Sequence, residues 1–216
     1  MKIHALLAGA AILAATATPS LAQTAVSATT DLNVRAGPGP TFPVIGVIPA
    51  GGSAALGGCT ETGNWCQVSA SGQQGWVYSQ YLTADMSGQQ VVIVDHRADL
   101  QVPVTTYEND PGGEMAGATT GAIAGAIIGG PVGAAVGGAA GLATGALMDP
   151  PEQRVQYVQS NPVDPVYLEG EAVVGSRLPD TVVLHQIPDY NYEYVYVNGQ
   201  PVLVDPGNRQ IVYVVR

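Results

Sequence analysis

The sequence predicts a mainly β protein in which a Gly/Ala-rich helical hairpin separates a small β-barrel from a C-terminal antiparallel β-meander. Residues 24–85 consist of short alternating apolar runs separated by glycine turns, which is typical of a small barrel. Residues 116–148 contain no charged side chain and place glycine at every fourth position. Residues 176–216 combine alternating apolar runs with an Asn-Gly pair, a strong local signal of a β-hairpin.

Residues 1–22 have the organisation of a secretory signal peptide. Lys2 precedes a short apolar run, and small residues then place a cleavage site between Ala22 and Gln23. A membrane-spanning helix is the alternative, but the apolar run is shorter than the ~20 residues that a span needs. No cysteine lies near the cut, so we expect no lipid attachment there. We therefore expect an exported protein, in the periplasm or associated with the outer membrane.

Charge and composition exclude several classes of function. The whole chain has a formal net charge of −10, and removal of the signal with Lys2 leaves −11. Such a chain repels phosphate backbones, which argues against a nucleic-acid partner. The three histidines lie far apart in the sequence, and no spacing resembles a metal-ligand pair. The sequence predicts no metal site and no cofactor.

Cys59 and Cys66 are the only cysteines, and they lie close together in a chain expected to be exported. An even count in an oxidising compartment predicts a disulfide rather than a metal site or a catalytic thiol. The redox alternative lacks a Cys-x-x-Cys spacing. A bridge across so short a loop adds about 2–3 kcal/mol to the stability of a barrel that has little core of its own.

Four motifs follow one another in the first 60 residues after the signal. They read TTDLNVRAGPGP over residues 29–40, VIGVIPAG over 44–51, GNWCQV over 63–68 and GWVYSQYL over 75–82. In this order they resemble bacterial SH3-like domains, with the resemblance covering about residues 27–84. The resemblance implies a small β-barrel that binds cell-wall peptides or envelope proteins.

Candidate residues for the ligand groove of this module are mostly aromatic. They are Tyr78, Tyr81, Phe42, Trp65 and Trp76. Trp65 and Trp76 could instead belong to the core, because large aromatic side chains dominate small cores. Arg35 is the only cation of residues 24–85. It can meet the carboxylate of a ligand, or it can form a structural ion pair with Asp31 or Glu61.

Eight of the ten glycines in residues 116–148 keep one four-residue register. They are Gly117, Gly121, Gly125, Gly129, Gly133, Gly137, Gly141 and Gly145. A spacing of four places them on one face of a helix, where glycine lets two helices approach closely. The pattern resembles the glycine-zipper segments of bacterial envelope proteins. It predicts membrane association or self-association into a homo-oligomer.

The sequence of this segment is compatible with three geometries. Gly129, Gly130 and Pro131 interrupt it, so two helices over 116–130 and 131–148 could pack as a hairpin. The competing geometry is a single kinked span. A flexible linker is the third, because isolated glycine-rich helices are poor in water. Acidic residues 86–115 are expected to connect the barrel to this segment, and residues 149–175 are expected to be a proline-rich linker.

Residues 192–215 predict a three-stranded meander. Runs 192–197 and 200–204 flank Asn198-Gly199, and a second turn leads into 210–215. Three tyrosines, at 192, 194 and 196, share one face and form either a recognition stripe or a half-buried surface packed on residues 182–187. Residues 176–216 resemble a domain family of unknown function, number 1236, found in exported proteins. That resemblance implies no activity.

The predicted function is that of a non-catalytic envelope adaptor. In this reading the SH3-like module binds a cell-wall peptide or envelope protein, and the glycine-rich segment anchors or oligomerises. An enzyme is not predicted, because no Cys/His pair, Ser/His/Asp set or pair of cleft carboxylates is recognisable. The alternatives are a membrane-permeabilising oligomer and an accessory module of a cell-wall hydrolase system.

Overall fold

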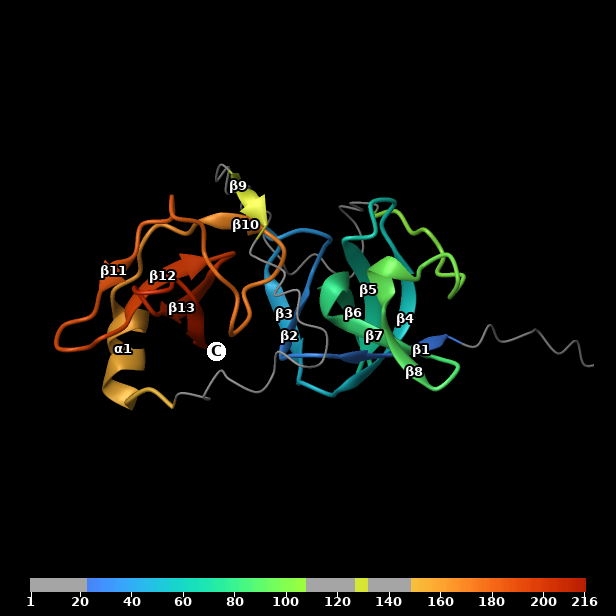
Figure 1. The fold of residues 1–216 in the computed structure, drawn as a ribbon, viewed down its shortest axis with the longest axis horizontal. Helices are drawn as coiled ribbons and strands as arrows, with labels where there is room; N and C mark the ends of the chain where they lie inside the picture. The colour runs from blue at the N-terminus through green and yellow to red at the C-terminus, as the bar shows by residue number, and fades with distance from the viewer. Residues whose placement is uncertain (1–22, 108–126, 132–148) are drawn as a thin grey trace, which may run out of the picture.

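The structure is a computed structural model that describes residues 23–107, 127–131 and 149–216. Within these residues the protein is mainly β, with two antiparallel sheets, one short parallel pair and one α-helix. Figure 1 shows a barrel module (residues 23–107) beside a C-terminal module (residues 149–216). This arrangement confirms the expected fold class, a small SH3-like barrel followed by a C-terminal β-sheet.

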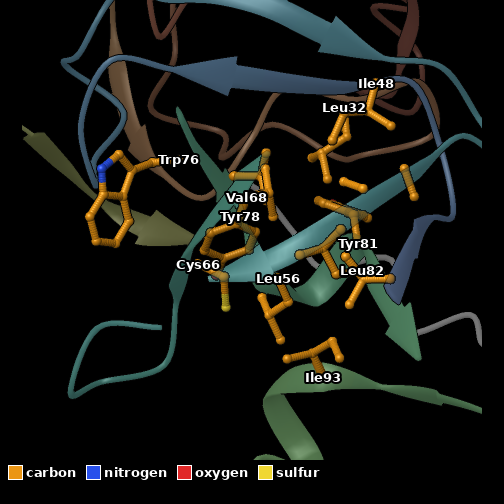
Figure 2. Packing of buried hydrophobic residues seen from close by; sticks show 14 of the residues in the cluster. Leu32, Ile48, Leu56, Cys66, Val68, Trp76, Tyr78, Tyr81, Leu82 and Ile93 are labelled. Carbon is orange, nitrogen blue, oxygen red and sulfur yellow. The ribbon is translucent and has the colours of Figure 1, made fainter. Parts of the chain in front are cut away.

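The barrel module is one eight-stranded antiparallel sheet in the order β3-β2-β6-β5-β4-β1-β7-β8. Its strands are β1 (Thr24–Ala28), β2 (Leu32–Arg35), β3 (Val44–Ile48), β4 (Ser53–Cys59), β5 (Trp65–Ala70), β6 (Gln73–Tyr78), β7 (Leu82–Met86) and β8 (Gln89–Val92). The 3-10 turns η1 (Ser79–Tyr81) and η2 (Ile93–Asp95) flank the last two strands. Leu32, Val68, Leu82 and Ile93 of η2 are fully buried in one core cluster, and Figure 2 shows Leu32 beside Ile48 at one end of it and Ile93 near Leu56 and Leu82 at the other.

The two cysteines form the expected disulfide. Cys59 at the end of β4 is the cross-strand partner of Cys66 on β5, and their Sγ atoms are bonded. Both are buried in the barrel core. The connector after β8 also packs here, because the backbone of Cys59 exchanges hydrogen bonds with Pro103 and Thr105 at 2.9 and 2.8 Å.

The C-terminal module is a four-stranded antiparallel sheet in the order β11-β12-β13-β14, covered by a helix. Its elements are α1 (Glu152–Ser160), β10 (Tyr167–Glu169), β11 (His185–Gln186), β12 (Glu193–Val197), β13 (Gln200–Val204) and β14 (Ile211–Val214). Asn198 and Gly199, with φ of 53° and 80°, form the expected tight turn between β12 and β13. Helix α1 and β10 lie within the residues that the sequence predicted as a linker.

The tyrosine stripe of β12 packs largely on α1. Tyr194 is buried with Val158 and Ile187, and its hydroxyl donates to the carbonyl oxygen of Asn161 at 2.8 Å. The hydroxyl of Tyr196 donates to the carbonyl oxygen of Val158 at 3.2 Å. These contacts place Tyr194 and Tyr196 at the interface between the sheet and its helix, whereas the ring of Tyr192 lies 5.4 Å from that of Tyr190.

The helical hairpin predicted over residues 116–148 is not confirmed. Strand β9 (Ile127–Pro131) pairs in parallel with β10, so the end of the helix expected over 116–130 is a strand, and Gly129 lies in it. The other seven glycines of the register lie outside the described residues, as do residues 1–22 with Ala22. In the described part of the chain, no helix has the length and apolar character that a membrane crossing requires.

Candidate functional site

Strand β2 carries the motif Leu-Asn-Val-Arg and presents two different faces. Successive side chains of a strand point to opposite sides, so Leu32 and Val34 enter the barrel core. Asn33 and Arg35 point the other way, yet each has a relative exposure of 0%. The C-terminal module covers them, and Figure 1 shows β2 and β3 on the side of the barrel next to that module.

Arg35 forms a buried, bidentate ion pair with Glu171 of the C-terminal module. Its Nε lies 2.7 Å from Glu171 Oε2, and its Nη2 lies 2.7 Å from Oε1. Asn33 Nδ2 also donates to Glu171 Oε1, at 2.9 Å, and so does the backbone amide of Ala172, at 3.1 Å. The planar fork of an arginine matches a carboxylate in this way, which makes the pair specific as well as strong.

Carbonyl oxygens occupy the remaining side of the guanidinium. Arg35 Nη1 donates to the carbonyl oxygens of Phe42, Pro40 and Asn198 at 2.7, 3.1 and 3.3 Å. Asn33 donates a second bond to Gln200 Oε1 at 2.7 Å. A buried charge is tolerated only when it is paired and its other donors are satisfied, and both conditions are met here.

Two of the aromatic candidates line the same interface. Tyr78 and Tyr81 are only 4% and 8% exposed, and their rings lie 6.1 Å apart. The hydroxyls of Tyr81 and Ser176 lie 3.5 Å apart, and Asn64 Nδ2 donates to Glu169 Oε1 at 3.0 Å. Burial raises the pKa of both tyrosines, and the nearby Glu169 carboxylate raises that of Tyr78 further. The C-terminal segment 169–176 therefore covers this part of the barrel.

The other aromatic candidates have different surroundings. Trp65 is 5% exposed and packs edge-on against Tyr78 at 5.5 Å, within the barrel core. Phe42 and Trp76 both contact the ring of Tyr107, at centroid distances of 5.3 and 6.0 Å. The six candidate residues thus do not form one open groove, because two of them meet the connector and the rest are buried.

The partner of Arg35 is a residue that the sequence did not single out. Asp31 instead pairs with Arg216 at 3.4 Å, and Glu61 is exposed. Glu171 stands 136 positions from Arg35 in the chain, between the buried residues Leu168 and Val173. An acidic residue within the largely apolar run 166–174 is a local signal that could have marked it, since buried carboxylates need a partner, but Glu169 in the same run carries the same signal.

Among the described residues, no group of three or more His, Cys, Asp or Glu side chains is placed to hold a metal ion. The Glu171 carboxylate is held by the arginine fork of Arg35 and the side-chain amide of Asn33, next to two buried tyrosines.

Comparison with protein families defines the class of each module. The model of the bacterial SH3 domain matches residues 30–83, which are strands β2 to β7 of the barrel. A second model, described as a domain of unknown function (DUF1236), matches residues 157–216. The match begins within α1, upstream of the expected residue 176, and agrees with the packing of α1 on the sheet. The predicted resemblances to the bacterial SH3 domain and to DUF1236 are confirmed, whereas no match shows the glycine-zipper segment.

One relative adds a cell-wall context. The "Putative N-acetylmuramoyl-L-alanine amidase YrvJ" of Bacillus subtilis (strain 168) is 34% identical over 71 residues. The match covers 33% of this chain and 13% of the amidase, and it concerns the SH3 part. Together with the disulfide, the bacterial SH3 match fits an extracellular or cell-envelope protein.

Proposed function

We propose that this protein is a non-catalytic cell-envelope adaptor whose SH3-like barrel binds a cell-wall peptide or an envelope protein. The observation that carries this proposal is the carboxylate-binding pair, Asn33 and Arg35, on the outer face of a bacterial SH3 domain. An arginine fork that recognises a carboxylate is a binding device and needs no further catalytic group.

The cell wall is the favoured source of the ligand. The amidase relative is named for the bond between the muramoyl sugar and the peptide of the wall, and its similarity to this chain lies in the SH3 part. Wall peptides end in free carboxylates, which is the chemistry that the Arg35 site accepts. The signal peptide expected over residues 1–22 and the Cys59–Cys66 disulfide support the same compartment.

The glycine-rich residues 116–148 are proposed to supply anchoring or self-association. These residues carry no charge. Seven of the eight glycines in the four-residue register lie outside strand β9. The segment lies in the chain between the two β modules, so attachment through a hairpin would leave both modules on the same side of the membrane.

Co-sedimentation tests the proposed binding. The mature chain, residues 23–216, is mixed with purified insoluble peptidoglycan and, separately, passed over envelope extract as an immobilised bait. We expect retention on at least one of these materials. A variant without residues 132–148 is the matched control, and it should bind equally because it keeps β9 and both β modules. A chain that binds neither material, with or without residues 132–148 and with or without Glu171→Ala, would contradict the proposed function.

A further inference from the structure

Segment 169–176 of the C-terminal module lies against the barrel module, and its backbone turns at Gly170, with a φ of 100°, and again at residues 173–176. Side chains alternate along it: Leu168 and Ala172 belong to the core of the C-terminal module. Glu169 and Glu171 contact the barrel module, and Val173 joins the barrel core. Residues 169, 171 and 173 therefore face the barrel module, in the way that a bound peptide presents every second side chain to a binding domain.

We propose that the Asn33–Arg35 face of the barrel is a binding site for carboxylate-bearing peptide segments and that Glu171 is its built-in occupant. An external acidic peptide binds there only when the C-terminal module has left the site. This inference rests on the proposed binding function and names the chemical class of the ligand and the state in which the site accepts it.

The contacts at the site select a carboxylate. Glu171 accepts four hydrogen bonds, from Arg35 Nε and Nη2, from Asn33 Nδ2 and from the amide of Ala172. Three of these donors belong to the barrel module and remain there when the segment leaves. A neutral amide in place of the carboxylate would leave the buried guanidinium without a counter-ion.

The C-terminal module holds its segment in a fixed shape. Asn198 Oδ1 accepts from the backbone amide of Leu168 at 2.8 Å, and Asn198 Nδ2 donates to the carbonyl oxygen of Gly170 at 3.1 Å. The carbonyl oxygen of the same Asn198 accepts from Arg35. The turn that joins β12 and β13 therefore both shapes the segment and contacts the site.

Covalent linkage favours the occupied state. The two modules belong to one chain, so the effective concentration of Glu171 at the site is on the order of millimolar. An external peptide then binds with an apparent Kd equal to its intrinsic Kd divided by the fraction of open molecules. Loss of the Glu171 carboxylate should raise the fraction of open molecules, and the external peptide should then bind with a higher apparent affinity.

A fluorescent peptide with the sequence of residues 167–178 tests the proposal. Its matched control carries only the Glu171→Gln change, so Glu169 is the same in both. The mature wild-type chain should bind the Glu peptide at least tenfold more weakly than the mature Glu171→Ala variant does. That variant should prefer the Glu peptide over the Gln peptide at least tenfold, and Arg35→Gln added to it should abolish the preference. Equal affinity for the two peptides would overturn the proposal.

A second measurement leaves Asn33, Arg35 and Glu171 unchanged, so it does not depend on how a substitution at the site affects folding. A protease site is placed within residues 132–148 of the otherwise wild-type chain, and the cleaved protein is analysed by gel filtration with millimolar peptide. The Glu peptide should separate the two fragments, and the Gln peptide should leave them together. Separation by both peptides or by neither would also overturn the proposal. Neither readout uses cell-wall material, so failure here is distinct from failure of the proposed adaptor function.

Discussion

Arg35 is fully buried, and its guanidinium is shared between the two modules of the protein. The sequence predicted that the carboxylate paired with Arg35 belongs to Asp31, to Glu61 or to a ligand. In the structure the partner of Arg35 is Glu171, and the side chains of both residues are at most 1% exposed. Pairing at this depth does not by itself guarantee a gain in stability, but loss of one partner leaves the other as an uncompensated buried charge.

Arg35→Ala is therefore expected to reduce the free energy of unfolding by about 3–5 kcal/mol. Arg177→Ala is the matched control, because Arg177 and its partner Asp180 are 65% and 80% exposed. An exposed pair contributes roughly 0–1 kcal/mol, so the control should unfold nearly as the wild type does. Urea unfolding followed by tryptophan fluorescence measures both. Similar losses in the two variants would show that the Arg35 pair has no special role.

Because Tyr81 is buried, we expect the free energy of unfolding to decrease at alkaline pH. Burial raises the pKa of its phenol above the value of about 10 for a free tyrosine. The unfolded chain therefore loses this proton at lower pH than the folded protein does. The contribution of Tyr81 to stability is complete below pH ~10 and is lost as the pH rises through the folded-state pKa.

Urea midpoints at pH 8 and pH 11 measure this effect. We expect the wild type to lose more stability between these two pH values than Tyr81→Phe does. The variant will still lose some, because burial also raises the pKa of Tyr78, Tyr190, Tyr194 and Tyr196. An identical decline in the two proteins would contradict the assignment.

At the scale of elements, the close approach of β6 to β2 depends on Gly75. A Cβ added there would lie 2.4 Å from Val34 Cγ1 and 2.8 Å from the carbonyl oxygen of Arg35. Backbone and a β-branched side chain cannot move away easily, so Gly75→Ala should destabilise the barrel by about 1–3 kcal/mol. Gly39→Ala is the control, since its nearest contact would be an ordinary 3.4 Å. Thermal unfolding by circular dichroism should separate the two variants, and equal melting temperatures would refute the steric argument.

Strand β9 shows why the glycine register gave the wrong secondary structure at residues 127–131. The four-residue spacing shows which side chains would share a helix face, but it does not show whether the backbone forms hydrogen bonds with another strand. Here the partner is β10, which lies some forty residues further along the chain. Ile127 and Ile128 are β-branched and Gly129 and Gly130 are poor helix formers, so a parallel partner strand outweighs the weak helical preference.

At the scale of the whole molecule, residues 116–148 are expected to determine where the protein resides. Deletion of these residues should release the mature protein from the membrane fraction into the soluble periplasmic fraction, because this uncharged segment is the proposed anchor. Fractionation and immunoblotting of cells that express each form make the comparison. A full-length protein that is already soluble and monomeric would contradict the anchor.

A leucine variant provides the control for apolar content. Replacement of Gly121, Gly125, Gly137 and Gly141 by leucine increases hydrophobicity and removes the small surface that close helix packing needs. If the register matters, chemical crosslinking in detergent should detect less oligomer, although membrane partition is maintained. An unchanged amount of oligomer would mean that the glycines reflect composition alone.

The sequence by itself determined the local features of this protein. Alternation along β2 and β5, the Asn198-Gly199 turn and the pairing of Cys59 with Cys66 each depend on residues a few positions apart. Four motifs in a fixed order were also enough to identify the bacterial SH3 barrel.

Only the tertiary structure decided how the candidate site is used. Tyr78 and Tyr81 were expected in an open groove, and they are covered because segment 169–176 docks on them. The choice of Glu171 over nearer acids depends on contacts across 136 positions, where local patterns carry no information. Burial of a charge is favourable only when distant groups converge on it, so it is a property of the assembled modules and not of either sequence motif.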